Sequence, residues 1–162
     1  MKKSIRVSLL AATLPVAAAT SALANPPTIE RVPIDGQFVD ESCGFAVTIE
    51  VKGFLVHITW VDPDGTQRGI DAAPQARWVL TNQDTGKSIT VNIAGPDKFT
   101  VNPDGSFKFA GTGTWGWTSN LDTGAPGLFL TEGRFVFALD SGGTLSYSRT
   151  GRMVDLCAEL AP

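Results

Sequence analysis

Apolar and polar residues alternate with a period of two along most of this chain. The alternation is clearest from Phe45 to Lys52, from Phe54 to Val61 and from Ser88 to Ile93. Because successive side chains of a strand point to opposite faces, this pattern predicts strands with one buried face. Turn signals separate such runs about every eight to twelve residues, as in all-β domains. A helical pattern is confined to one short window of the exported part, Val154 to Leu160.

Four-residue turn motifs join the expected strands. Asp62-Pro63-Asp64-Gly65 and Asn102-Pro103-Asp104-Gly105 each combine a proline that presets φ with a glycine that accepts positive φ. Both motifs also match the first half of a calcium loop, which would continue with further oxygen ligands. The residues that follow include Arg68 and Lys108, whose charge repels a cation. We therefore interpret both motifs as hairpin turns.

About eight or nine short strands joined by tight turns predict an antiparallel up-and-down meander. Exposed strand edges favour aggregation, so we expect the meander to form a closed or nearly closed barrel. Gly111 and Gly113 share one face of a strand, where missing side chains permit the sharp coiling of a barrel corner. The alternative is a two-sheet β-sandwich, which differs in where the sheet splits.

The first 24 residues have the three parts of a secretory signal peptide. Lys2, Lys3 and Arg6 form a positive region, an apolar stretch follows to Thr20, and Ala22-Leu23-Ala24 is a small-x-small cleavage site. The apolar stretch is too short and too weakly hydrophobic for a stable membrane span. The next residue is asparagine and not cysteine, so no lipid anchor is expected. We expect residues 1–24 to be cleaved and residues 25–162 to form a single secreted all-β domain.

The charge of the exported part disfavours two classes of partner. Three of the 13 basic residues lie in the signal peptide, which leaves ten against 16 acidic residues and a formal charge of −6. An acidic surface repels phosphate backbones, so nucleic acid is not an expected partner. It also disfavours binding to anionic lipid, which requires clustered lysine and arginine.

The chain has two cysteines, Cys43 and Cys157, near opposite ends of the exported part. In an oxidising compartment such a pair is expected to form a disulfide. A redox-active thiol would require a close C-x-x-C motif or a basic neighbourhood, and neither is present. We expect the bridge to join the first strand to the last.

Several segments together resemble a group of small, uncharacterised secreted proteins of actinobacteria. The segments are Thr81 to Asn92, Asn102 to Ser106, Gly111 to Trp115, an early Cys43-Gly44 and a late Asp155-Leu156-Cys157. The likeness covers nearly all of the exported chain and implies a bacterial secreted protein. It implies no activity and no functional residue. Avidins and lipocalins are similar in strand number and in their use of glycine and tryptophan, which is a likeness of fold alone.

Other motifs have simple structural interpretations. Gly111-Thr112-Gly113-Thr114-Trp115-Gly116 matches G-x-G-x-x-G, but a dinucleotide site needs a helix after it and here the alternation of a strand continues. His57 is the only histidine, so no multi-histidine metal site exists, and we interpret it as a half-exposed strand residue. We expect no cofactor, no metal and no catalytic residue.

Three carboxylates are not explained by turns: Glu50, Glu132 and Asp155. Two carboxylates on one face would suit glycoside hydrolysis. However, Lys52 and Arg134 follow the two glutamates by two residues, which predicts solvated charge pairs on an outer face.

The four tryptophans are the strongest candidates for ligand contact. Trp115 and Trp117 project to one side immediately before the longest irregular stretch, Thr118 to Gly127, which contains Pro126. Indoles at a barrel mouth can stack on a sugar ring or line an apolar pocket. Alternatively, the two rings fill the barrel and replace the volume missing at the glycines.

We therefore consider three functions. The first is a non-catalytic secreted module that binds a small apolar, carbohydrate or protein partner through Trp115, Trp117 and Pro126. The second is a small extracellular hydrolase or isomerase that uses carboxylates inside the barrel. The third is a structural surface protein.

Overall fold

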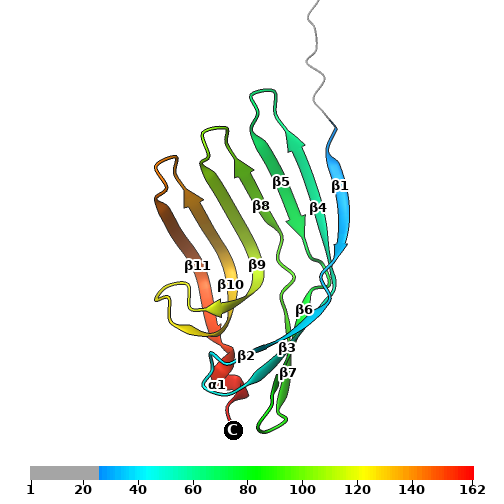
Figure 1. Ribbon diagram of the computed structural model, residues 1–162, viewed down its shortest axis with the longest axis vertical. Coiled ribbons are helices and arrows are strands. Elements are labelled where there is room, and N and C mark those ends of the chain that lie inside the picture. Colours follow the sequence, from blue (N-terminus) through cyan, green and yellow to red (C-terminus); the bar gives the residue numbers. More distant parts are fainter. Residues whose placement is uncertain (1–25) are drawn as a thin grey trace, which may run out of the picture.

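The computed structural model describes residues 26–162 and forms eleven strands and one short helix (Figure 1). The strands are β1 (Thr28–Pro33), β2 (Gly36–Asp40), β3 (Val47–Lys52), β4 (Phe54–Val61), β5 (Gln67–Ala72), β6 (Arg77–Asn82), β7 (Ser88–Asn92), β8 (Asp97–Val101), β9 (Phe107–Ser119), β10 (Pro126–Leu139) and β11 (Leu145–Asp155), followed by helix α1 (Leu156–Leu160). A seven-stranded sheet has the order β1-β4-β5-β8-β9-β10-β11, and a four-stranded sheet has the order β2-β3-β6-β7. The expected signal peptide lies outside the described residues. Within them, no helix is long and apolar enough to cross a membrane.

The chain runs up and down seven times, and each run pairs with the next. The first four runs are β1–β2, β3–β4, β5–β6 and β7–β8, each interrupted near its middle. One half of each lies in the seven-stranded sheet and the other half in the four-stranded sheet (Figure 1). One interruption is at Gly53, whose φ is +133° and where an added Cβ would lie 2.9 Å from the Cα of Ala76. All pairings are antiparallel, which confirms the predicted all-β antiparallel architecture.

The expected barrel is wrong, and the two-sheet alternative fits better. Neither sheet closes: β1 and β11 are the edges of the larger sheet, and β2 and β7 are the edges of the smaller one. The physical reason is the interruption of the first four runs, which places one half of each run in a separate sheet instead of around a cylinder. The edge strand β1 carries Glu30, Arg31 and Pro33. Charges and prolines of this kind hinder edge-to-edge association without closure.

A row of three glycines bends the long strands β9, β10 and β11. Gly113, Gly133 and Gly151 lie opposite one another, with φ of +89°, +134° and +100°. Beyond this row the chain folds back on itself. The evidence is the distance between the ring centres of Phe109 and Trp115, which is only 5.8 Å. Six residues of a straight strand would span about 20 Å. The predicted sharp coiling at Gly113 is therefore present, but it folds three strands instead of turning a barrel corner.

The main core lies between the four-stranded sheet and the folded-back ends of β9–β11. Trp78 of β6 packs over Gly116 of β9, where any side chain would collide with the indole. Helix α1 closes this core with two fully buried leucines. The buried members of the cluster are Val47, Ile49, Trp78, Leu80, Leu128, Leu130, Leu156 and Leu160.

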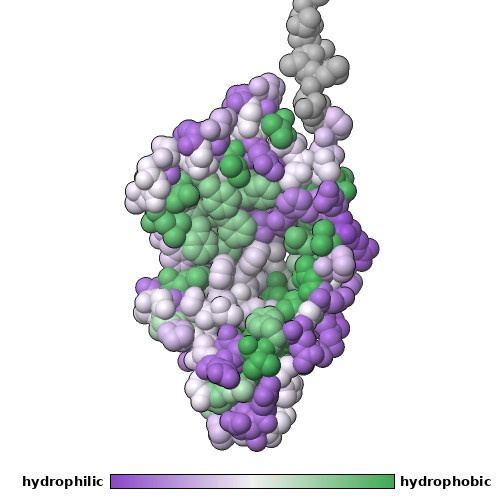
Figure 2. All heavy atoms as spheres, in the orientation of Figure 1, coloured by the Kyte–Doolittle hydropathy of each residue, from purple (hydrophilic) through white to green (hydrophobic). Residues whose placement is uncertain are grey.

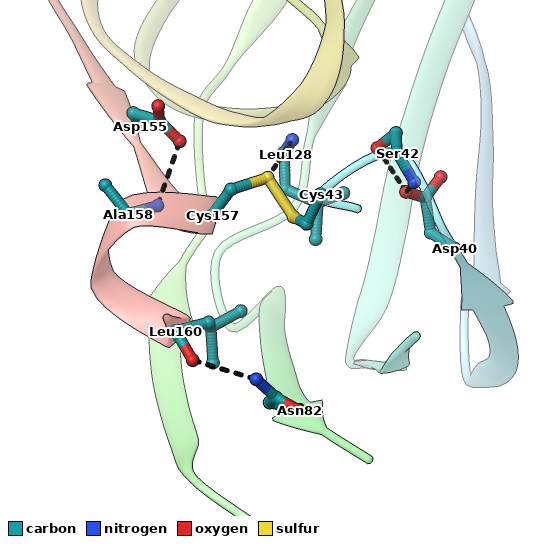
Figure 3. Close-up of a disulfide and its surroundings, with 9 residues drawn as sticks. All are labelled: Asp40, Ser42, Cys43, Asn82, Leu128, Asp155, Cys157, Ala158 and Leu160. Atoms are coloured by element: carbon teal, nitrogen blue, oxygen red, sulfur yellow. Dashed lines mark hydrogen bonds between the residues drawn. A yellow bond between two sulfur atoms is a disulfide. The ribbon is translucent and has the colours of Figure 1, made fainter. Parts of the chain in front are cut away.

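The structure confirms that Cys43 and Cys157 form a disulfide, with Cα atoms 5.2 Å apart (Figure 3). The expected position of this bridge was wrong: it does not join the first strand to the last. It links the β2–β3 connection to α1, and so ties the smaller sheet to the end of the chain. Asp155 caps α1 by accepting a hydrogen bond from the backbone N–H of Ala158 at 3.2 Å. Asn82 holds the other end by donating to the carbonyl oxygen of Leu160 at 3.1 Å.

Candidate functional site

The register of the seven-stranded sheet places four aromatic side chains side by side on one face. Phe99, Phe109, Phe137 and Tyr147 lie opposite one another on β8, β9, β10 and β11. We call this side of the sheet the aromatic face. Each of the four side chains is half-buried, and the rings of Phe137 and Tyr147 are 4.8 Å apart. The face therefore presents a strip of rings in register that is neither core nor freely exposed.

Phe135 lies in the next row of the same face, with its ring centre 5.6 and 5.7 Å from those of Phe109 and Phe137. Its side chain is 1% exposed and occupies the space that a side chain at Gly111 would fill. Gly111 thus permits dense ring packing, and not the coiling expected for it.

The two predicted ligand-contact tryptophans border the same strip. The glycine bend brings both indoles onto Phe135. The ring centres of Trp115 and Trp117 lie 5.3 and 5.2 Å from that of Phe135, and each pair is edge-to-face. Trp117 donates its indole N–H to the hydroxyl of Thr131 at 2.9 Å. Trp115 donates to the carbonyl of Thr112 at 3.2 Å. Both rings are half-buried, so they combine a packing role with some exposed surface.

The irregular stretch expected from Thr118 to Gly127 is shorter in the structure. Strand β9 continues to Ser119 and β10 begins at Pro126, which leaves only residues 120–125 as a loop. Asn120 accepts hydrogen bonds from the backbone N–H groups of Asp122 and Thr123 at 2.9 and 3.1 Å. Asp122 also forms an ion pair with Arg149 of β11. The loop is therefore fastened to the sheet, and Pro126 is an exposed residue at the start of β10.

A second row of side chains on the aromatic face is polar. Glu30, His57, Asp71 and Asp97 lie opposite one another on β1, β4, β5 and β8. Nδ1 of His57 bonds to the carboxylate of Asp71. The imidazole also stacks on Phe99, with ring centres 5.7 Å apart and planes 13° apart. The structure thus brings together an acid–base row that sequence reasoning missed, and Phe99 connects it to the aromatic strip.

Gly69 makes this connection possible. It lies between His57 and Phe99 on the sheet, and an added Cβ would meet Cδ1 of Phe99 at 3.0 Å and still closer ring atoms. With no side chain at position 69, the ring of Phe99 can lie across β5 and reach the imidazole. The predicted half-exposed strand histidine is therefore a half-buried residue with two specific partners.

Asp97 is the most unusual member of the row. Its side chain is 3% exposed, and Oδ1 has no hydrogen-bond partner among residues 26–162. Burial, and to a lesser extent the nearby charge of Asp71, raise the pKa of this carboxyl to about 7, whereas His57 acts in the opposite direction. Burial with an unpaired oxygen disfavours the charged form of a carboxyl group.

Replacing Asp97 with asparagine should stabilise the protein at alkaline pH but not at acid pH. An acid whose folded-state pKa exceeds its unfolded value of 3.8 destabilises the fold progressively as pH rises toward about 7. Asparagine mimics the neutral form, so the variant should be roughly 2–4 kcal/mol more stable at pH 8 and equal at pH 4. Urea unfolding at both pH values measures this. An equal loss of stability at pH 4 and pH 8 would contradict the raised pKa of Asp97.

The opposite face of the same sheet is basic. It carries Arg68, Lys98, Lys108 and Arg134, with surface depressions of about 260 and 340 Å³ on either side of Arg134. Arg68 pairs with Asp62 at 2.6 Å. The other three cations form no ion pair with any residue in the described part of the chain.

The expected charge pairs are right in one case and wrong in the other. Glu50 pairs with Lys52 at 2.6 Å. Glu132, however, pairs with Arg152 of the neighbouring strand and not with Arg134, because the cross-strand neighbour lies closer than the residue two positions along. The third carboxylate, Asp155, is the cap of α1 (Figure 3).

The remaining motifs have structural roles. The G-x-G-x-x-G segment lies entirely within β9, and no helix follows it. The turn carboxylates of Asp64 and Asp104 each accept a backbone N–H at 2.9 Å, which confirms their interpretation as hairpin turns. Comparisons of this chain with protein-family models, with curated protein sequences and with solved structures find no significant match.

Proposed function

We propose that this protein is an exported module that binds an apolar ligand on the aromatic face. The observation that carries the proposal is the strip of four half-buried rings, Phe99, Phe109, Phe137 and Tyr147, on an open sheet. In Figure 2 an apolar patch lies over β8–β11, and the visible face is hollowed beside it. Contiguous apolar patches on soluble proteins commonly mark binding sites. Each square ångström of apolar surface that a ligand covers contributes about 25 cal/mol.

Two further features support this function. The rings of the aromatic face pack against Phe135, which in turn packs against Trp115 and Trp117, so a ligand meets preformed surface. Preformed sites lose less conformational entropy on binding. The disulfide supports export, because such bonds persist in oxidising compartments. The signal-like first 24 residues and the resemblance to secreted actinobacterial proteins agree with the same compartment.

The proposal is tested with decyl maltoside, an uncharged amphiphile, below its critical micelle concentration. Trp60, on the opposite face of β4, is first replaced by phenylalanine, so that the exposed reporters are Trp115 and Trp117. We expect saturable quenching or a spectral shift with one ligand per chain. Phe137→Leu keeps apolar volume but removes a ring, and should weaken binding about three- to tenfold, since one aromatic contact is worth ~0.5–1.5 kcal/mol.

Phe38→Leu is the matched control, because Phe38 is a 44% exposed phenylalanine on the other sheet. It should leave the affinity unchanged. An emission spectrum that no amphiphile alters, or equal losses in both variants, would contradict a site on the aromatic face.

Acid–base catalysis is a second candidate, favoured by the His57–Asp71 pair. A carboxylate that orients one imidazole nitrogen leaves the other free to exchange a proton with a bound molecule. No serine or threonine hydroxyl bonds to His57 in the part of the chain that the structure describes, so water would be the nucleophile in a hydrolysis. Mass analysis of the amphiphile after the titration separates the two functions: binding returns it unchanged, whereas catalysis returns a modified product.

A further inference from the structure

Most of the basic side chains of the seven-stranded sheet lie on one face, and a row of acidic side chains lies on the other. The basic face collects the cations Arg68, Lys98, Lys108 and Arg134. The aromatic face instead carries three carboxylates in one row, Glu30, Asp71 and Asp97, together with His57. Because neighbouring residues of a strand point to opposite faces, this separation follows directly from the register. The ligand face is therefore negative where it meets the aromatic strip.

The one arginine on the aromatic face does not offset this charge. Arg149 lies opposite Phe135 on β11, at the far end of the row. It forms an ion pair with Asp122 and donates to the carbonyl of Gly151 at 3.0 Å. The carboxylates near β4, β5 and β8 consequently have a single basic neighbour, His57, which the structure bonds to Asp71.

Asp97 is a carboxyl group at this end of the face that forms no ion pair with any of the described residues. Its carboxyl is almost completely buried, and one oxygen has no partner among the described residues. Asp71 is more accessible, with 18% of its side chain exposed. A cation placed above Asp71 would interact with that carboxylate directly and, when Asp97 is ionised, with the neighbouring carboxylate of Asp97 on β8. Such interactions strengthen where water is excluded.

The adjoining rings suit the same kind of ligand. Phe99 lies against His57, with the strip of Phe109, Phe137 and Tyr147 extending away from it. The face of an aromatic ring attracts cations, and groups of aromatic rings are used to bind quaternary ammonium ligands. An apolar chain lying on the strip would bring its head group to the acid–base row.

We propose that the ligand of the aromatic face is an amphipathic organic cation. Its apolar body lies along Phe109, Phe137 and Tyr147, and its ammonium or guanidinium head lies between Phe99 and Asp71, with Glu30 at the rim. This inference rests on the proposed function and specifies the chemical class of its ligand. Metal ions are not the cations concerned, since no group of three or more His, Cys, Asp or Glu side chains within residues 26–162 is arranged to hold one.

The test compares three amphiphiles with the same decyl chain and different heads: trimethylammonium, maltoside and sulfate. Each is titrated below its critical micelle concentration, in 0.15 M salt, with calorimetry and tryptophan emission as readouts. We expect decyltrimethylammonium to bind at least tenfold more tightly than decyl maltoside, and decyl sulfate to bind most weakly. The stoichiometry should be one per chain, because scattered attraction to an acidic protein would give several weak sites.

Two variants locate the charge effect. Asp71→Asn should lower the affinity for the cation about tenfold and leave that for the maltoside unchanged. Glu30→Gln, at an exposed position on the edge strand, should lower it about two- to threefold without affecting the His57 pair. Asp84→Asn is the matched control: it removes one equal charge at an exposed turn and should change neither affinity.

The outcomes separate the two proposals. Equal binding of the cationic and uncharged amphiphiles, or equal losses in Asp71→Asn and Asp84→Asn, would overturn the cationic ligand and leave the aromatic site standing. Absence of binding by all three amphiphiles would overturn the proposed function itself. If circular dichroism shows that Asp71→Asn is unfolded, the Glu30→Gln comparison decides the question in the same way.

Discussion

Replacing Gly133 with alanine should destabilise the protein by about 3 kcal/mol or more, because this glycine combines two constraints. Its φ of +134° lies in a region that side chains disfavour. An added Cβ would also collide with the carbonyl oxygen of Thr150 and lie 3.0 Å from the Cα of Gly151. Both obstacles are backbone of the neighbouring strand, so no side-chain rearrangement relieves them. Urea unfolding monitored by circular dichroism measures the change.

The control for this experiment is Gly36→Ala. Gly36 also lies in a strand, but its φ is not positive and an added Cβ would meet nothing within 4 Å. This variant should remain within about 1 kcal/mol of the parent. If the two variants lose similar stability, the row formed by Gly113, Gly133 and Gly151 is not what bends β9, β10 and β11.

Removing the disulfide should cost ~2–5 kcal/mol while leaving the sheet content unchanged. The bridge closes a separation of 114 residues, and a loop of that length has much conformational entropy in the unfolded chain. Its loss would also free α1, whose Leu156 and Leu160 complete the core. The double variant Cys43→Ser, Cys157→Ser avoids a lone reactive thiol, and thermal and urea unfolding give the difference.

Mass measurement of the purified protein provides the control for that comparison, since the parent should be two hydrogens lighter than its reduced form. Two reactive thiols in the native parent would contradict the disulfide. An unfolding midpoint that does not change in the double variant would contradict its stabilising role.

The local part of the fold could be predicted from the sequence. The alternation from Phe54 to Val61 predicts one strand, and the structure forms β4 over the same residues. The two Asp- and Asn-initiated turns were also identified correctly, because their chemistry is contained in four residues. By contrast, β1 and β2 lie in a segment, Thr28–Asp40, with no clear alternation. Both are edge strands with mostly exposed side chains, so backbone pairing and not burial defines them.

The candidate site could be predicted only in part. Trp115 and Trp117 are recognisable as a pair because they alternate within one strand. The acid–base row is not recognisable, because its members come from four strands and only the register brings them together. Asp71 ends a strand with weak alternation, and Asp97 directly follows the Gly95-Pro96 break. The barrel expectation failed for a similar reason: local pattern does not show where a run bends.

The seven-run topology has a consequence for the order of assembly. Each run pairs with the one that precedes it, so every hairpin closes a short loop, and short loops cost little entropy to close. The sulfur bridge is the exception, since it joins residues 114 positions apart and lies between the β2–β3 connection and α1. With two cysteines in the whole sequence, only one intramolecular pairing exists. Folding therefore requires no reshuffling of mispaired bonds within the chain.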